Sequence, residues 1–168
     1  PFDKSPVVEK LEKDYKSEKI TLSKVLTLAL NDLARRNRIT LNSLLQIAWA
    51  IMLGRYSNEK EIVFGAIVSG RPVEIEGVES MLGLFINTLP VRLSLPSNVS
   101  ILTLAKELYA QQVIQNQYSY TPLTDIQALI GLESHLPLFE SIMAFENYPV
   151  DKSQSKNESG IKVLDSRI

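Results

Sequence analysis

The sequence predicts a mixed α/β domain, and three features of its apolar pattern indicate this class. Two apolar runs, 61–68 and 84–93, have the length and the β-branched and aromatic content typical of buried strands. Two helical patterns precede these runs and a third follows them. The predicted order is helix, helix, strand, strand, helix, strand, with the last strand over 138–145.

The first helix is expected from Ser23 to about Arg36, where Arg35 and Arg36 suit the negative end of the helix dipole. Its apolar stripe, which we expect to pack into the core, consists of Leu22, Val25, Leu26, Ala29 and Leu33. The second helix is expected to begin between Thr40 and Ser43, because Ser43 and Gln46 have capping-box spacing, and to end near 54–58. Its predicted buried stripe consists of Leu41, Leu44, Leu45, Ala48, Met52 and Tyr56, with Trp49 beside it.

The third helix should begin after Ser100, a good N-cap residue, and run to about Asn116. Pro122 is suited to open a short helix that continues through Ile130. The second strand, the third helix and the strand over 138–145 are interpreted as a βαβ unit with a right-handed crossover. The polar tract 151–160 is predicted to be a mobile loop, and 161–168 is a candidate final strand.

Composition limits the function classes. A length of 168 residues fits one domain, and a net charge of −1 gives no support for a nucleic-acid or anionic-membrane partner. The absence of cysteine excludes disulfides and thiol nucleophiles, and it is compatible with a cytoplasmic location. No apolar run reaches the roughly 18–20 residues that a membrane span needs, and the charged opening segment does not resemble a signal peptide. The sequence therefore indicates a soluble cytoplasmic domain without membrane or nucleic-acid partners.

Polar residues stand out in and between the two central strands. The connection Ser69-Gly70-Arg71-Pro72 has the composition of a turn with a cation at its tip. Asn87 and Thr88 lie among apolar neighbours in the second run. Because a buried strand must give amides and hydroxyls partners, we expect these side chains to face a cleft.

Several segments in the same order resemble a known family. They are FGAIVSGRP (64–72), GVESMLGLFINTLPVR (77–92), YTPLTDIQ (120–127) and LFESIMAFENYP (138–149). Together they are similar to the C-terminal half of condensation domains of nonribosomal peptide synthetases, over roughly residues 20–150. The resemblance implies a chloramphenicol-acetyltransferase-like half-domain: a two-layer α/β lobe with helices on one face of a mixed sheet. Residues 1–20 would then be a linker, and 21–168 a C-terminal lobe truncated at both ends.

The resemblance also implies an activity that this chain does not carry alone. Intact domains of the family join two aminoacyl or peptidyl thioesters through an amide bond, with both substrates on phosphopantetheine arms of peptidyl carrier domains. The family's two adjacent histidines and spaced Asp-Gly belong to the N-terminal half, whereas this chain has one histidine, His135. We therefore expect no catalytic residue, no metal and no directly bound cofactor here. The implied partners are the N-terminal lobe and the carrier and adenylation domains.

The resemblance implies that this lobe forms a tunnel wall, with Asn87 near the reaction centre. The candidate substrate-binding residues are Ser69, Gly70, Arg71, Gly83, Phe85, Asn87, Thr88 and Arg92. Arg71 has two interpretations: a partner of a carboxylate or a helix carbonyl, or a cation bordering the phosphopantetheine channel. Asn87 could satisfy neighbouring backbone groups, or it could orient the substrate or brace the histidine loop.

Other polar residues favour ordinary roles. His135 is predicted to be a solvated loop residue, since no second histidine or cysteine accompanies it. Asp125 is expected in the first turn of a helix, where the dipole favours an acid. Nucleotide-binding and serine-hydrolase motifs are absent. Two alternatives remain: a non-catalytic docking module that keeps the lobe, and an epimerization-type relative.

Overall fold

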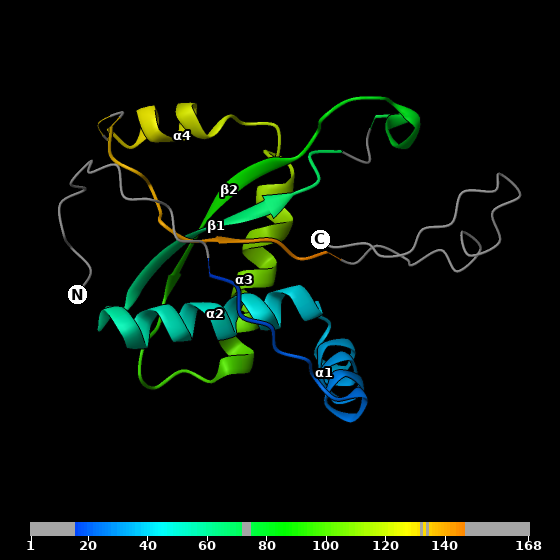
Figure 1. Ribbon diagram of the computed structural model, residues 1–168, viewed down its shortest axis with the longest axis vertical. Coiled ribbons are helices and arrows are strands. Elements are labelled where there is room, and N and C mark those ends of the chain that lie inside the picture. Colours follow the sequence, from blue (N-terminus) through cyan, green and yellow to red (C-terminus); the bar gives the residue numbers. More distant parts are fainter. Residues whose placement is uncertain (1–15, 72–74, 132, 134, 147–168) are drawn as a thin grey trace, which may run out of the picture.

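The computed structural model describes residues 16–71, 75–131, 133 and 135–146 (Figure 1). Its elements in chain order are α1 (Lys24–Asn37), α2 (Leu41–Ser57), β1 (Glu61–Val68), the short 3-10 helix η1 (Val78–Ser80), β2 (Asn87–Ser94), α3 (Ile101–Asn116), α4 (Leu123–Leu129) and β3 (Ile142–Met143). The predicted order of helices and strands is confirmed within these residues. The tract 151–160 and the candidate strand 161–168 lie outside them.

The described sheet has the strand order β2-β1-β3 and is mixed, as expected. β1 pairs antiparallel with β2, with Gly65 opposite Pro90, and parallel with β3, with Gly65 opposite Ile142. The interpretation of β2, α3 and β3 as a βαβ unit is wrong. β2 and β3 lie on opposite sides of β1 and run in opposite directions, so they do not form a parallel pair.

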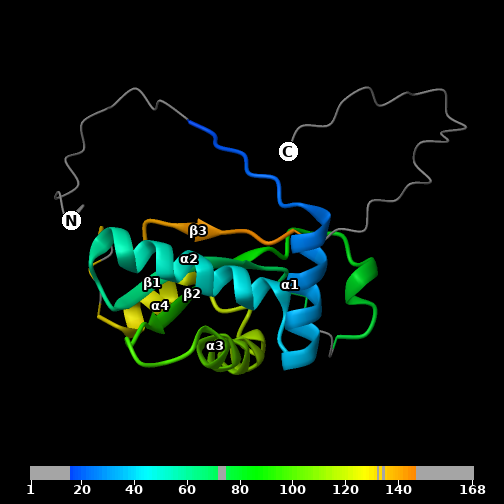
Figure 2. The same ribbon diagram turned by 90° about the horizontal axis from the view of Figure 1, so that it is seen from below.

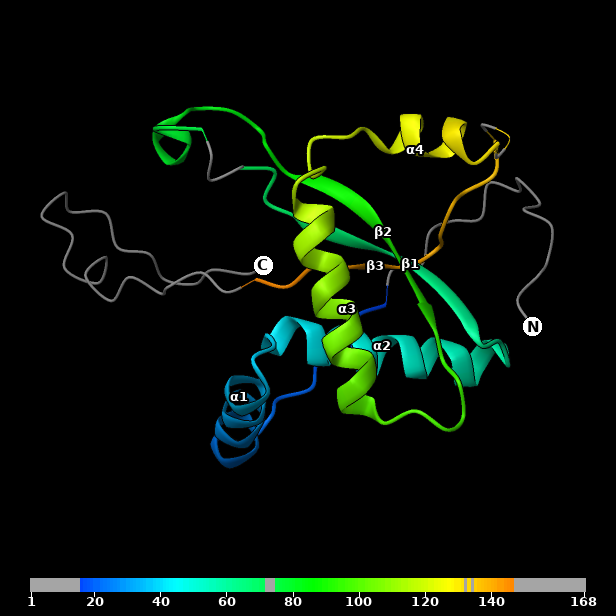
Figure 3. The same ribbon diagram turned by 180° about the vertical axis from the view of Figure 1, so that it is seen from behind.

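The core lies between one face of the sheet and the layer made by α2 and α3, and α3 crosses the sheet in Figure 3. Strand alternation places every second residue of β1 and β2 on this inner face. The buried strand residues are Ile62, Phe64, Ala66, Leu89, Val91 and Leu93, and the buried helix residues in contact with them include Ile47, Ala50, Leu104 and Leu108. The helices therefore cover the sheet on the face that the apolar alternation selects.

The opposite face of the sheet is covered at Gly65 by Phe139. A Cβ atom on Gly65 would lie 2.5 Å from Cε2 of Phe139 and 2.9 Å from Cγ2 of Thr88. The absence of a side chain at this position therefore lets the aromatic ring approach the strand backbone. At the neighbouring edge, Trp49 Nε1 donates a 2.8 Å hydrogen bond to Ser141 Oγ, which joins α2 to the residue before β3.

Helix α1 stands across one end of α2 (Figure 2). The Ser23 side chain accepts a hydrogen bond from the Leu26 N–H, so Ser23 is the N-cap residue. The prediction that the apolar stripe of α1 is buried is wrong, because only Ala34 in this helix is buried and Val25 is 79% exposed. The helix forms where its apolar periodicity indicates, but the described part of the chain leaves most of that stripe uncovered.

Helix α2 begins one turn earlier than the proposed capping box. Its N-cap residue is Thr40, which accepts from the Ser43 N–H, while Ser43 itself is buried. The predicted buried stripe is right only in part: Leu44 is buried and Leu41 and Leu45 are half-buried, but Ala48, Met52 and Tyr56 are exposed. The buried residues are Ser43, Leu44, Gln46, Ile47, Ala50 and Gly54. The helix is apolar on nearly all sides, so its pattern did not define which side faces the sheet.

The later elements agree more closely with the sequence. Ser100 caps α3 by accepting from the Thr103 N–H, as expected. Pro122 is the N-cap of α4 and not its first helical residue. The last described strand is shorter than predicted, since only Ile142 and Met143 of the run 138–145 pair with β1. Helix α4 contacts β2 and lies apart from the α2–α3 layer (Figure 1).

Candidate functional site

The first residue of β2, Asn87, connects this strand to the segment before α4. Its Nδ2 atom donates 2.8 Å hydrogen bonds to the backbone oxygens of Ser119 and Thr121. Its Oδ1 atom accepts a 2.8 Å bond from the Thr88 N–H. The carboxamide thus uses both donors and an acceptor within the chain. The requirement that a polar strand residue find partners is met by backbone groups of a distant segment.

Side-chain contacts also occupy the edge of β2 that faces away from β1. Gly65 directs its N–H to Ser141, so the opposing residue Pro90 directs its peptide groups away from β1. Pro90 has no N–H to offer, and its carbonyl accepts from Gln115 Nε2 at 3.0 Å. The Thr88 N–H, which points the same way, is bonded to Asn87. β2 is therefore protected against pairing with a further strand at these positions.

Between β1 and β2 the chain forms a projection that we call the arm, whose described residues are 69–71 and 75–86 (Figures 1 and 3). Arg71 Nη1 donates hydrogen bonds to the backbone oxygens of Val78 and Met81, the latter at 3.1 Å. Its guanidinium carbon lies 4.2 Å from the centroid of the Phe85 ring. A cation–π contact of this kind contributes about 0.5–2 kcal/mol. Arg71 thus bonds to backbone carbonyls of the arm. This agrees with the first of its two interpretations, in which it is the partner of a carboxylate or a helix carbonyl.

The base of the arm is closely packed. Gly70 has φ +61°, and a Cβ atom there would lie 1.8 Å from the Phe85 carbonyl oxygen, so this position requires glycine for both conformation and space. A Cβ atom on Gly83 would lie 3.1 Å from Cε2 of Phe85, so this glycine also lies close to the Phe85 ring. Ser69 is exposed beside Gly70. Three of the predicted site residues, Gly70, Arg71 and Gly83, thus gather around Phe85, and Ser69 precedes Gly70 in the chain.

Thr88 and Arg92 lie elsewhere on β2. Thr88 faces the side of the sheet that carries Phe139. Arg92 is four residues further along the strand, roughly 13 Å away at a strand rise of about 3.3 Å per residue, and its Nη2 lies 3.1 Å from Glu61 Oε2. A hydrogen bond from Ser94, together with one from Arg92, lowers the pKa of Glu61 below its ordinary value. The structure therefore does not bring Arg92 to the arm.

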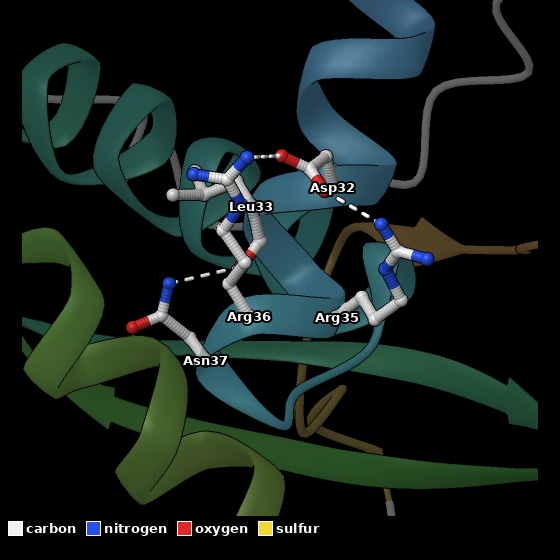
Figure 4. Close-up of polar contacts among 5 residues, drawn as sticks. All are labelled: Asp32, Leu33, Arg35, Arg36 and Asn37. Atoms are coloured by element: carbon white, nitrogen blue, oxygen red, sulfur yellow. Dashed lines mark hydrogen bonds and ion pairs between the residues drawn. The ribbon is translucent and has the colours of Figure 1, made fainter.

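An acidic residue at the last turns of α1 joins two arginines (Figure 4). Asp32 contacts Arg35 at 2.8 Å and Arg36 at 2.7 Å. The hydrogen bond from Arg35 is the largest cause that lowers the pKa of Asp32, and the charge of Arg36 acts in the same direction. In the same view, Asn37 Nδ2 donates to the Leu33 carbonyl at 2.9 Å. These contacts all join residues within the last turns of α1, and they leave both guanidinium groups largely exposed.

A cavity of about 780 Å³ lies between the helices and the end of β1. Its polar lining is rich in amides, and the residues concerned are Asn31, Asn42, Gln46, Gln112, Gln115 and Asn116. None of the eight predicted substrate-binding residues is among the described residues that line it. The cavity is therefore distinct from the predicted tunnel wall.

Beside this cavity, α2 and α3 are joined by a partly buried chain of hydrogen bonds. Ser43 Oγ donates to Gln112 Oε1 at 2.8 Å, and Gln112 Nε2 donates to Gln46 Oε1 at 2.8 Å. Both α2 residues are almost fully buried. Sequence reasoning assigned Ser43 and Gln46 to a cap and did not identify Gln112. Their spacing on α2 was visible, but the partner lies 66 or more residues away.

The remaining titratable candidates have the ordinary settings that the sequence suggested. The His135 side chain is 70% exposed, with its Nε2 3.4 Å from Glu133 Oε2. Asp125 lies in the first turn of α4. The described residues contain no group of three metal-ligating side chains, and none of their helices is long and apolar enough to span a bilayer.

Comparison with known proteins decides the family. The condensation-domain family model matches residues 2–166. The chain belongs to this family, the condensation domains of nonribosomal peptide synthetases. This confirms the resemblance on which the sequence interpretation rests.

The relatives are far longer than the chain. A linear gramicidin synthase of Brevibacillus parabrevis is 46% identical over 162 residues, which are 96% of the chain and 3% of the relative. Bacitracin synthase 3 of Bacillus licheniformis is 39% identical over 147 residues, 86% of the chain and 2% of the relative. The chain thus spans only a few per cent of the length of these synthetases.

Solved structures agree on the fold. A four-domain nonribosomal peptide synthetase bound to AMP and glycine aligns with a TM-score of 0.68 at 20% identity, over 79% of the chain and 10% of that structure. The first condensation domain of the CDA synthetase aligns with a TM-score of 0.61 at 17% identity, over 73% of the chain and 27% of that structure. The α/β fold with a mixed sheet is therefore the chloramphenicol-acetyltransferase-like fold of condensation domains, as predicted.

Proposed function

We propose that this chain is the C-terminal lobe of a condensation domain that forms amide bonds between carrier-bound aminoacyl or peptidyl thioesters. In this reaction the amine of the acceptor attacks the thioester carbonyl of the donor, the carbon–sulfur bond breaks, and the thiol of the donor's phosphopantetheine arm leaves. Residues 21–168 form the lobe, and 1–20 link it to the half that carries the catalytic histidines. The chain by itself is inactive.

The match of the family model to residues 2–166 carries this proposal. It is supported by the share of a whole condensation domain that the aligned chain occupies, 27% of the CDA synthetase domain. The exposed apolar side chains of α1 and of the arm, among them Val25, Leu82 and Leu84, are further support. A self-contained docking module would be expected to pack such side chains into its own core and so to leave no large apolar patch exposed.

The residues at the base of the arm and at the start of β2 form part of a wall of the tunnel through which the phosphopantetheine groups of the carrier domains pass. Asn87 shapes this wall by holding the segment 119–121 against β2. Gly70, Arg71 and Phe85 shape it by fixing the arm. The partners are the N-terminal lobe and the peptidyl carrier and adenylation domains of the synthetase, and the substrates arrive covalently attached to the carriers.

A domain exchange tests the proposal. The segment of the linear gramicidin synthase that matches this chain is replaced by residues 2–166, and the complete condensation domain is supplied with two loaded carrier domains. We expect dipeptidyl carrier product, detected by mass spectrometry of the intact carrier protein. In the matched control, the synthase receives its own segment back by the same cloning procedure, with silent codon changes and an unchanged amino-acid sequence. A folded exchange protein that forms no amide with any of a panel of aminoacyl donors and acceptors contradicts the proposal.

A further inference from the structure

The cavity of about 780 Å³ lies on the helix side of the sheet. Its lining includes Ala66, Leu89 and Val91, which belong to the inner face of β1 and β2. Thr88 and Phe139 cover the other face of the sheet at Gly65. Sites for small molecules have volumes of about 300–1,000 Å³. The cavity is thus large enough for a small molecule, and the sheet separates it from the face that carries Phe139.

The lining combines amide groups with apolar side chains. Six of its described residues are asparagine or glutamine, and apolar side chains of both long strands and of α3 lie between them. No charged side chain is among the described lining residues. An ion placed there would lose its hydration without gaining a counter-charge, and a polyol would leave hydroxyl groups against apolar walls. The lining therefore fits an uncharged molecule that has an apolar body and a polar group.

Two amides of the lining keep hydrogen-bonding capacity that the described residues do not use. Gln46 is 3% exposed, and its Nε2 donates to Asn42 Oδ1 at 3.2 Å, which leaves its second N–H. The orientation of this amide is fixed, because its Oε1 accepts from Gln112 Nε2 at 2.8 Å. Gln115 is half-buried, and its Nε2 donates to the Pro90 carbonyl, which leaves Oε1 as an acceptor. The lining thus offers both a donor and an acceptor to a neutral ligand.

We propose that this cavity binds a neutral small molecule that carries a carboxamide on an apolar body. The carboxamide oxygen accepts from the second N–H of Gln46, or its NH₂ group donates to Gln115 Oε1, and the body lies against Leu89 and Val91. A carboxamide suits the cavity because it supplies a donor and an acceptor without charge. This binding goes beyond the proposed function, since it needs neither a carrier domain nor a thioester.

The first measurement titrates 3-phenylpropanamide into this chain labelled with nitrogen-15. We expect the side-chain NH₂ signals of Gln46 and Gln115 to shift and to saturate, while that of Asn98, an exposed residue of the loop before α3, stays unchanged. The matched compound is 3-phenylpropanoate, which carries a carboxylate at neutral pH and should bind at least about tenfold more weakly. No saturable shift up to about 10 mM overturns the site, and equal binding of the carboxylate overturns the ligand class.

The second measurement uses two neighbouring positions of α3. Val113 lines the cavity and is 50% exposed, whereas Ile114 is 61% exposed and is not part of the lining. V113W should place its ring over the cavity and weaken binding of 3-phenylpropanamide at least about tenfold, and the control I114W should bind as wild type does. Both side chains are exposed, so both variants should keep the thermal midpoint of the chain. Wild-type binding by V113W, or an equal loss in I114W, overturns the location.

The third measurement repeats the titration by calorimetry on the complete exchanged domain described above. We expect an affinity within about threefold of that of this chain. Loss of binding in the complete domain overturns the inference, because the cavity would then be filled by other parts of the domain. An exchanged domain that binds the probe but forms no amide counts against the proposed function alone. One that forms amide but does not bind the probe counts against this inference alone.

Discussion

The side-chain nitrogen of Asn87 lies 2.8 Å from the backbone oxygen of Thr121, although the two residues are 34 positions apart in the chain. The same nitrogen bonds to Ser119 at 2.8 Å. One carboxamide therefore joins the start of β2 to the segment that leads into α4. This contact both places that segment and, through the Thr88 N–H, helps to close the outer edge of the sheet.

Removing this carboxamide should loosen the segment 118–121 and lower stability. N87A leaves two partly buried carbonyls without donors, so we expect a loss of about 1–3 kcal/mol in the free energy of unfolding by urea denaturation. N87D keeps the shape but places a carboxylate against the same two carbonyls, and it should be at least as destabilising. Amide exchange should rise in peptides covering 118–121. An N87D protein as stable as wild type would show that these bonds contribute nothing.

The contact between Gly65 and Phe139 predicts a pair of compensating substitutions. G65A adds a methyl group where Cε2 of Phe139 is only 2.5 Å away, and overpacking of this kind costs about 1–3 kcal/mol. F139L removes part of the ring and should make G65A less harmful in the double variant than in the single one. A double-mutant cycle of chemical denaturation measures the difference. Strictly additive effects would mean that the ring does not lie on the strand.

The hydrogen-bond chain between α2 and α3 predicts an asymmetry between single and double changes. Q112A leaves Gln46 Oε1 without its donor and Ser43 without one partner, and should cost about 1–3 kcal/mol. Replacing Gln46 and Gln112 together by leucine removes both polar groups and should cost less than the sum of Q46L and Q112L measured separately, so that wild type, the two single variants and the double variant form the cycle. Unfolding free energies of the four proteins test this. A double change that costs the full sum would contradict the coupling.

Asp32 predicts a specific pH dependence. Its pKa in the folded chain is lowered from the ordinary value of 3.8, mainly by the hydrogen bond from Arg35. Stability from this carboxylate is therefore present above the unfolded-state pKa and is lost as the pH falls through the lower folded-state value. Carboxyl carbon NMR should give a midpoint below 3.8 for Asp32 in the wild type, and R35Q should move it upward. An unchanged midpoint in R35Q would contradict the assignment.

The elements that were predicted from the sequence are those whose signals are local. β1 carries a continuous apolar run, and α3 starts at a serine that caps it, so both were placed correctly. The buried side of α2 was not predictable from periodicity, because apolar residues surround the helix and its buried Ser43 and Gln46 are paired through α3. The strand over 138–145 was overestimated, since only two of its residues pair within the described sheet.

The candidate site divides in the same way. Asn87 and Arg71 were selected because a polar residue in an apolar strand and a cation at a turn each need partners. The sequence did not identify the individual partners: those of Asn87 lie 32 and 34 residues away, and Arg71, for which a helix carbonyl was one of the alternatives, bonds to the carbonyls of Val78 and Met81. The role of each residue depends on those partners, so the sequence could select these positions without distinguishing their alternative roles.

The most direct test of the central claim is an amide-formation assay with this chain alone and with the complete exchanged domain, each supplied with the same donor-loaded and acceptor-loaded carrier domains. The account predicts no dipeptidyl carrier from the chain alone and clear product from the complete domain. Amide formation by the chain alone, above the rate with heat-denatured chain, would contradict the claim that the chemistry belongs to the other half of the domain.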